Sequence, residues 1–239
     1  MKILILKPSS LGDVVQALPV LRLLKQHWPE SQIYWWIETR LAGLLEADPD
    51  LAGVILFDRE GWKRPLGWWQ IARTIAFMRR QRFDLVIDLQ GLFRSAVVAW
   101  MTNGAFTIGV DDPREGARAF YDVAVRRPSS PHAIEWYLEV LRHLQVPVHE
   151  KFDWLPVCSR AAKEIGQKWA MDGQRWIVVQ PGARWETKRW PVDYFSRAVN
   201  RLSRTLPQFR FAIMGSADDA SLAAQIIGAN PKTCLDLTG

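Results

Sequence analysis

The chain has 239 residues, of which 49% are hydrophobic and 23% are charged, and its formal net charge is +6. This composition excludes an intrinsically disordered chain, because the apolar content is high and both signs of charge are mixed. No apolar run approaches the ~18 residues of a membrane-spanning helix. The apolar stretch in the start MKILILK is shorter than that of a typical secretory signal, so we expect no signal peptide there. Two cysteines cannot form a disulfide framework, so we expect a reduced, cytoplasmic protein.

Short apolar runs alternate with segments of helical periodicity along the first 145 residues. Such runs suit strands that are buried on both faces, as in parallel sheets. Pro19 interrupts the first helical segment, where we expect a bend or a staggered helix. The expected strands are 2–7, 33–37, 53–57, 84–89, 106–110 and 121–125, and the expected helices are 13–27, 40–47, 67–82, 92–102 and 131–145.

The alternation loosens around 146–160 and then restarts with a helix at 160–170. We expect further strands at 176–180, 209–215 and 234–237, and helices at 191–205 and 217–228. This alternation predicts an α/β protein with parallel sheets. The expected division is a first domain at 1–150, a linker and helix at 151–170, and a partial second domain at 171–239. A doubly wound domain normally has more strands than this second part, so we expect it to be incomplete.

Residues 59–82 contain seven Lys or Arg and one Glu, so the rest of the chain is balanced in charge. Trp62, Trp68 and Trp69 lie in the same window. A basic patch with aromatic residues can face an anionic membrane, a phosphorylated ligand or nucleic acid. A solvated helix whose tryptophans fill the core would give the same pattern. Nucleic acid is the weakest option, because no recognised binding motif accompanies the patch.

The loop KPSSLGD (7–13) lies between the first expected strand and the first expected helix. Ligands of open α/β sheets bind at the carboxyl ends of strands, so this loop is a candidate site. It contains neither G-x-G-x-x-G nor G-K-[ST], which argues against a nicotinamide dehydrogenase and against a P-loop. The loop offers two serine hydroxyls and one carboxylate, Asp13. N-capping of the helix is the alternative role for Asp13.

Three stretches together resemble a known family. They are KPSSLGDVVQALPVLRLLK, FDLVIDLQGLFRSAVVAW and QPGARWETKRWP, which look like the glycosyltransferases of family 9, the lipopolysaccharide heptosyltransferases, and within them heptosyltransferase I. The resemblance covers essentially the whole chain. It implies the GT-B architecture of two Rossmann-like domains with parallel sheets. The N-terminal domain would bind the acceptor, the Kdo of a lipid A precursor, and the C-terminal domain the donor, ADP-L-glycero-D-manno-heptose.

Family members generally have longer chains, with a D-T-G-x-x-H motif that holds the donor beyond the position of Gly239. The resemblance therefore implies a chain truncated at its C-terminus, with the second domain incomplete. Two alternatives to a complete heptosyltransferase stay open. One is a non-catalytic fragment that binds acceptor or membrane, and the other is a family member with a different nucleotide sugar.

The resemblance also implies roles for individual residues. Asp13 matches the catalytic base, which takes the proton of the acceptor hydroxyl in an inverting transfer. Lys188 matches a lysine near the donor phosphates, where a fixed cation stabilises the departing ADP. The expected substrate-binding residues are Ser9, Ser10, Gly12, Gln90, Gly91, Arg114, Arg184, Thr187 and Asp219.

Structural alternatives exist for several of these residues. The two serines could merely shape the turn, and Lys188 could be a solvated loop charge. Arg114 could form a surface ion pair with Asp111 or Asp112 instead of meeting acidic groups of the acceptor. Asp219 could reach a ribose or complement the start of a helix. Arg184 stands where some family members have a hydroxyl residue, which leaves its role open.

The four histidines and two cysteines show no spacing typical of metal ligands, so we expect no metal and no cofactor apart from the donor substrate. The expected partners are the nucleotide-sugar donor, Kdo-lipid A and the inner leaflet of the membrane, which the basic window would face. We expect no nucleic acid partner. The expected location is cytoplasmic and peripheral at the inner membrane.

Overall fold

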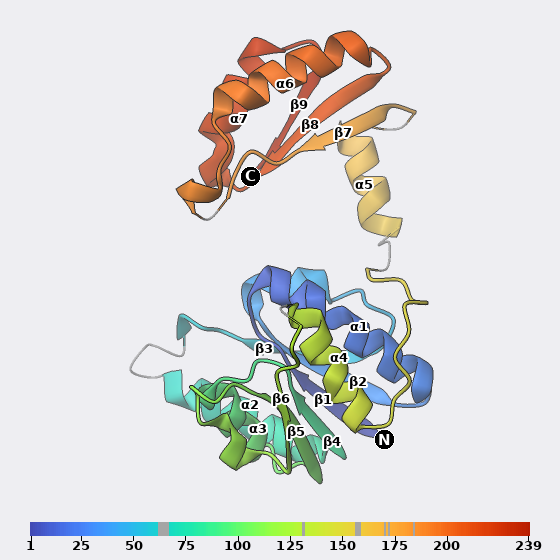
Figure 1. Ribbon diagram of the computed structural model, residues 1–239, viewed down its shortest axis with the longest axis vertical. Coiled ribbons are helices and arrows are strands. Elements are labelled where there is room, and N and C mark those ends of the chain that lie inside the picture. The colour runs from blue at the N-terminus through green and yellow to red at the C-terminus, as the bar shows by residue number, and fades with distance from the viewer. Residues whose placement is uncertain (62–66, 131, 156–158, 170, 172, 184) are drawn as a thin grey trace. The chain divides into compact units, whose positions relative to one another are not determined.

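The computed structural model describes residues 1–61, 67–130, 132–155, 159–169, 171, 173–183 and 185–239. The chain divides into two compact units, Met1–Cys158 and Ser159–Gly239 (Figure 1). This boundary lies later than the expected end of the first domain at 150. The reason is that the segment after 146 packs on the first unit, where Gln26 and Arg22 donate hydrogen bonds to the carbonyls of Lys151 and Asp153. Helix α5 (Ser159–Trp169), which we assigned to the linker region, belongs to the second unit.

Six parallel strands form the sheet of the first unit, in the order β3-β2-β1-β4-β5-β6. They are β1 (Lys2–Leu6), β2 (Gln32–Glu38), β3 (Leu51–Phe57), β4 (Leu85–Asp88), β5 (Phe106–Asp111) and β6 (Val123–Arg126). The chain runs outward from β1 to β3 and returns to β4, which pairs with the other side of β1. The carboxyl ends of β1 and β4 therefore meet where the strand order reverses. Doubly wound folds bind ligands in the crevice at such a point.

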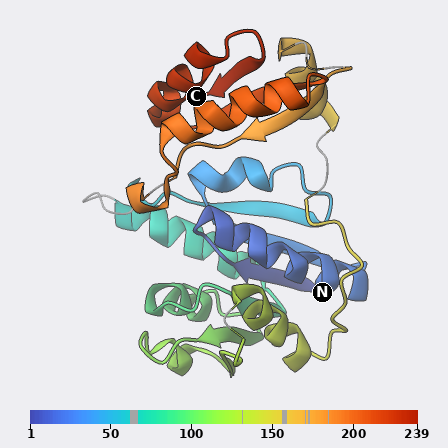
Figure 2. The same cartoon turned by 45° about the horizontal axis from the view of Figure 1, so that its top comes forward.

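Helices cover both faces of this sheet, as Figures 1 and 2 show. Successive side chains of a strand point to opposite faces. Ile3 and Ile5 accordingly pack in one core with α1 and α4, whereas Leu4 and Leu6 pack in the other with α2 and α3. The helical elements are α1 (Leu11–His27), η1 (Thr39–Leu44), α2 (Gly67–Gln81), α3 (Phe93–Met101), η3 (Ala117–Phe120) and α4 (Ala133–His143).

Helix α1 is a single helix that passes through Pro19, so the expected stagger is not found. Proline removes one backbone hydrogen bond from a helix interior. Burial of apolar residues on both sides of Pro19, from Val14 to Leu24, offsets this loss. The helix also begins earlier than expected, at Leu11, and its first turn therefore includes Asp13.

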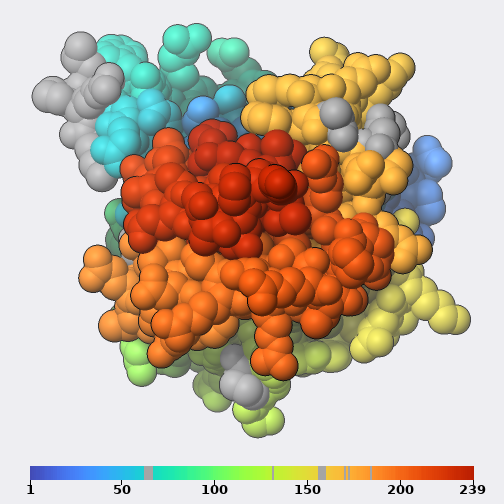
Figure 3. All heavy atoms as spheres, turned by 90° about the horizontal axis from the view of Figure 1, so that it is seen from above, coloured from blue at the N-terminus to red at the C-terminus, as the bar shows by residue number. Residues whose placement is uncertain are grey.

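Three parallel strands form the sheet of the second unit, in the order β7-β8-β9. They are β7 (Arg175–Val179), β8 (Phe209–Gly215) and β9 (Cys234–Thr238), accompanied by η4 (Glu186–Lys188), α6 (Val192–Thr205), η5 (Ala217–Asp219) and α7 (Ala220–Ala229). Val199 of α6 and Ile226 of α7 pack with Phe211 of β8 in one core. These two helices cover one face of the sheet, and their atoms are orange to red in Figure 3. The expected strands of both units are confirmed, and all pairs are parallel.

Candidate active site

Asp13 lies in the first turn of α1, directly after the loop that follows β1. Its Oδ2 accepts hydrogen bonds from the backbone N–H of Ser10, at 3.1 Å, and from the Ser10 hydroxyl, at 2.8 Å. These bonds hold the carboxylate in place and start the helix, so the capping role considered above is present. The other oxygen, Oδ1, accepts no hydrogen bond from a described residue. One oxygen of an oriented carboxylate is thus left for a proton from outside the protein.

Two charged residues at the ends of β1 and β4 were missed by the sequence analysis. Lys7 follows β1 and is 4% exposed, and Asp88 ends β4 and is fully buried. Burial lowers the pKa of Lys7, and the charges of Asp13 and Asp88 oppose that shift. Burial raises the pKa of Asp88, although its hydrogen bonds act the other way. A signal for both was present, since each is a charged residue at the end of an otherwise apolar run.

Asp88 orders the loop after β4. Its Oδ1 accepts hydrogen bonds from the backbone N–H groups of Gln90, at 2.8 Å, and Gly91, at 3.2 Å. Its Oδ2 accepts a bond from the hydroxyl of Tyr121, at 2.8 Å. Burial and the charge of Asp88 raise the pKa of Tyr121, so this hydroxyl keeps its proton and acts as a donor. The loop that carries Gln90 and Gly91 is therefore held from beneath by one buried carboxylate.

Gly91 has a backbone conformation that suits glycine, with φ of +68°. A Cβ at this position would lie 2.7 Å from Cγ2 and 2.9 Å from the carbonyl oxygen of Val110 on β5. The adjacent Gln90 is half-buried, and its buried Oε1 accepts no hydrogen bond from a described residue. The glycine thus allows the chain to turn tightly and to present the Gln90 amide at the crevice.

Replacing Gly91 with Ala is expected to lower the free energy of unfolding of the first unit by about 1–3 kcal/mol, because it adds backbone strain and a clash with Val110. Urea denaturation followed by tryptophan fluorescence measures this change. Gly12→Ala is the matched control, since a Cβ there meets nothing within 4 Å and the residue is helical. That variant should be more stable by about 0.5–1 kcal/mol. Equal effects at both positions would contradict the steric argument.

A cavity of about 330 Å³ lies at the same crevice. Ser9 and Gln90 line it together with the guanidinium-bearing residues Arg59 and Arg94. Its other lining residues are Pro8, Trp36, Phe57, Ile71, Leu92, Ser95 and Val98. An apolar wall with a few polar groups is typical of a small-molecule site. The two arginines would favour a ligand that carries acidic groups.

The other predicted residues of the first unit, Arg114 and Gly12, have fewer contacts. Arg114 is exposed in the loop after β5, and its backbone N–H donates to Asp112 at 3.1 Å. The alternative ion pair of Arg114 with Asp111 or Asp112 is not found among the described residues. Gly12 is exposed, and no close neighbour requires a glycine there.

The predicted residues of the second unit follow its first two strands. Thr187 and Lys188 are exposed in η4, after β7. Asp219 is buried after β8, and its Oδ2 accepts two hydrogen bonds from Ser216, both at 2.9 Å. A Cβ at Gly182 would overlap the Asp219 carboxylate. Asp219 therefore starts a helical turn, as its alternative role supposed. Arg184 lies outside the described residues.

Comparison with known proteins decides the family. Residues 71–239 match the model of glycosyltransferase family 9 (heptosyltransferase). The chain belongs to this family. The resemblance stated from the three sequence stretches is thereby confirmed.

Individual members of family 9 agree with this assignment. The chain is 30% identical, over 84% of its residues and 58% of the relative's length, to lipopolysaccharide heptosyltransferase 1 of Pseudomonas aeruginosa. A solved family 9 glycosyltransferase from Veillonella parvula is 22% identical with a TM-score of 0.85, over 100% of this chain and 70% of that one. The structure of E. coli heptosyltransferase WaaC with ADP-2-deoxy-2-fluoro heptose is 22% identical in sequence and matches with a TM-score of 0.81. That match covers 99% of this chain and 76% of the E. coli chain. The predicted GT-B fold is confirmed, and the chain spans little more than half the length of two curated relatives.

The basic window of this family 9 chain has an exposed aromatic pair. Trp68 and Trp69 are 53% and 57% exposed at the start of α2, and their rings stack with centroids 4.1 Å apart. The alternative that these tryptophans fill the core is therefore wrong, because Ile75 and Met78 of α2 face the sheet instead. Trp62, Lys63 and Arg64 lie outside the described residues. The remaining arginines of the window, namely Arg59, Arg73, Arg79, Arg80 and Arg82, are exposed.

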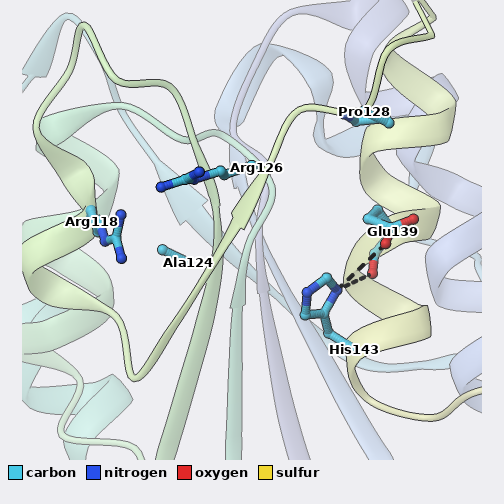
Figure 4. Close-up of a pocket in the computed structure, with 6 residues that line it drawn as sticks. All are labelled: Arg118, Ala124, Arg126, Pro128, Glu139 and His143. Carbon is cyan, nitrogen blue, oxygen red and sulfur yellow. Dashed lines mark hydrogen bonds and ion pairs between the residues drawn. The ribbon is translucent and has the colours of Figure 1, made fainter.

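A second hollow, of about 430 Å³, lies along the outer strand β6 (Figure 4). Arg118 of η3 and Arg126 of β6 lie on one side, and the Arg126 guanidinium points away from α4. On the other side, His143 contacts Glu139 within α4. Nδ1 of His143 lies 2.9 Å from the backbone carbonyl oxygen of Glu139. None of the predicted site residues that the structure describes lines this hollow.

No group of three or more His, Cys, Asp or Glu side chains in the described ranges could hold a metal ion. No helix among those ranges is both long and apolar enough to cross a membrane.

Proposed function

We propose that the protein transfers heptose from ADP-L-glycero-D-manno-heptose to the Kdo of lipid A with inversion. The observation that carries this proposal is the Asp13 carboxylate, which Ser10 anchors through Oδ2 at the β1–β4 crevice. The names of the relatives support the class of reaction. The E. coli structure with an ADP-heptose analogue supports the donor. In this proposal the first unit binds the acceptor and the second unit binds the donor.

The chemistry follows from one free carboxylate oxygen. Asp13 Oδ1 accepts the proton of the acceptor hydroxyl while the hydroxyl oxygen attacks the anomeric carbon of the heptose. The new carbon–oxygen bond forms on the face opposite the bond to ADP, which breaks, so the configuration at that carbon inverts. The cavity beside Ser9 and Gln90 holds the acceptor sugar, and Arg59 and Arg94 pair with its acidic groups.

The departing ADP gains negative charge on its β-phosphate. In our proposal Lys188, which is exposed in η4, stabilises this charge, and Thr187 beside it donates a hydrogen bond to the same phosphates. Arg189 holds the loop, because its Nε donates to the carbonyl of Ala183 at 2.8 Å. Asp219 has a supporting role at the ribose. We propose that the reaction needs no metal and no cofactor beyond this donor.

The test is ADP release by the 239-residue chain from ADP-heptose, with and without a Kdo-lipid A acceptor and in the presence of EDTA. Release that requires the acceptor and persists in EDTA is the expected result. Acceptor binding without release would favour a non-catalytic fragment. Release of nucleotide only from another nucleotide sugar would indicate a family member with a different donor. Loss of release in EDTA alone would overturn the metal-free part of the proposal.

We also propose that the protein works in the cytoplasm at the inner leaflet of the membrane, with α2 facing the lipid. Its exposed arginines and stacked tryptophans are residue types that favour an anionic lipid surface. Lipid A is itself anionic, so a basic helix on the acceptor-binding unit would keep the enzyme near its substrate.

Reversing the charge of Arg79, Arg80 and Arg82 to Glu is expected to weaken binding to vesicles of phosphatidylethanolamine and phosphatidylglycerol by at least about 100-fold at low salt, because each basic residue near such a surface contributes about 1 kcal/mol. Vesicle sedimentation measures this binding. The same triple reversal on α6, at Arg197, Arg201 and Arg204, is the charge-matched control. Equal losses in both proteins would contradict a specific role for α2.

A further inference from the structure

Lys7 is the one buried lysine among the described residues. It follows β1 in the middle of the sheet, and its carbonyl oxygen accepts a hydrogen bond from Trp35 Nε1 at 3.1 Å, which fixes its backbone. A buried ammonium is costly unless nearby groups compensate its charge. We therefore expect the buried charge of Lys7 at the crevice to have a functional role.

Charged and aromatic groups surround the Lys7 ammonium from several elements. Asp13 of α1 and Asp88 of β4 are the charges that act on it. Nζ lies 5.2 Å from the centre of the Tyr137 ring of α4, within the range of a cation–π contact. On β2 the buried Glu38 is paired with Arg40, at 2.8 Å, and so has its own cation. Two further groups affect Lys7 only indirectly. Arg127 interacts electrostatically with Tyr137, and Tyr121 interacts with Asp88.

The carboxylates of Asp88 and Asp13 differ in how many hydrogen bonds they already accept. Asp88 already accepts hydrogen bonds from Gln90, Gly91 and Tyr121. Asp13 accepts only those of Ser10 among the described residues, through one oxygen. Two carboxylates near one site repel each other, which favours protonation of one of them unless a cation lies between their charges. Lys7 Nζ has no hydrogen-bond partner among the described residues, so its charge is not committed elsewhere.

We propose that Lys7 is a positioning residue whose buried ammonium keeps Asp13 ionised, and so able to accept a proton, in the presence of the Asp88 charge. This inference rests on the proposed function through the role of Asp13 as the base. Lys7 acts through Asp13 and does not itself take the proton. Tyr137 supports the ammonium from the side of α4 through its ring.

The test is a titration that needs no substrate. The carboxyl group of Asp13 is followed by NMR in protein labelled with 13C at the aspartate side chains, and its resonance is assigned through Asp13→Asn. In Lys7→Met, which keeps an unbranched side chain one atom shorter and removes the charge, the titration midpoint of Asp13 should rise by about 1–3 pH units. Lys2→Met, at the other end of β1, is the control and should leave the midpoint unchanged.

An unchanged Asp13 midpoint in folded Lys7→Met protein would overturn the inference. If Lys7→Met does not fold, the reciprocal measurement decides, because coupling between two sites acts equally in both directions. The ε-carbon of Lys7, assigned through Lys7→Arg, should titrate at lower pH in Asp13→Asn than in the wild type. No difference there would also overturn it. Both titrations are independent of ADP release, so failure of the transferase function is distinguishable from failure of this inference.

Discussion

Asp13→Asn is expected to lower kcat/KM for heptose transfer by about 10²- to 10⁴-fold, the range that general-base catalysis contributes. The amide can still accept hydrogen bonds from Ser10, so the first turn of α1 is retained, but it cannot take a proton from the acceptor. Steady-state ADP release measures the rate. Acceptor binding should be nearly unchanged, because the loss is confined to the step in which the proton moves.

Asp193→Asn is the matched control for this variant. Asp193 is likewise an aspartate in the first turn of a helix, α6, and it is exposed. Its substitution should leave the rate within about twofold, since surface changes of this kind have small effects. Retention of more than about a tenth of the wild-type rate by Asp13→Asn would contradict its role as the base. Urea denaturation of both variants separates a lost base from a lost fold.

Arg22→Leu is expected to lower the free energy of unfolding of the first unit by about 3–5 kcal/mol, because it leaves a buried charge without its partner. The side chains of Arg22 and Asp48 are only 6% and 1% exposed and form an ion pair. Arg22 also binds Asp50, at 2.6 Å, and donates to the carbonyl of Asp153 at 3.1 Å. One side chain thus joins α1, the loop before β3 and the segment after 150. Urea denaturation measures the change.

Arg142→Leu provides the comparison for a surface ion pair. Arg142 is 45% exposed and pairs with Glu139 and Glu135 on the same helix, α4. Its loss should cost at most about 1 kcal/mol. Adding Asp48→Asn to Arg22→Leu should restore part of the lost stability, because the second change removes the unpaired charge. A double variant as unstable as the sum of the two single variants would show that charge burial is not the cause.

Much of the fold could be predicted because buried parallel strands are nearly continuous apolar runs. Residues 3–6 and 85–88 are such runs, and both became central strands. The strand order could not be predicted in the same way. Pairing of Leu6 with Asp88 joins positions far apart in the chain, and local periodicity holds no information about it. The approach of Asp88 to Lys7 depends on that pairing, and the sequence analysis therefore missed it.

The side of helix α2 that packs on the sheet could not be predicted from the sequence either. The stretch around Trp68 and Trp69 could bury either its tryptophans or the positions of Ile75 and Met78. Which side meets the sheet is decided by the shape of the core and by the strands beneath it, so composition alone leaves both open. Gly91 follows β4, as expected, while its close approach to Val110 became visible only with β5 in place.

The hydrogen bonds between Ser10 and Asp13 have a consequence for the motions of the protein. The same turn contains the backbone bond from the Val14 N–H to the Ser10 carbonyl, at 2.9 Å. Fraying at the start of α1 would therefore release the carboxylate as well as the amide. Helix ends open more often than helix centres, so we expect the base to be misdirected in molecules in which this turn is open. Amide hydrogen exchange at Val14 would report how often the turn opens.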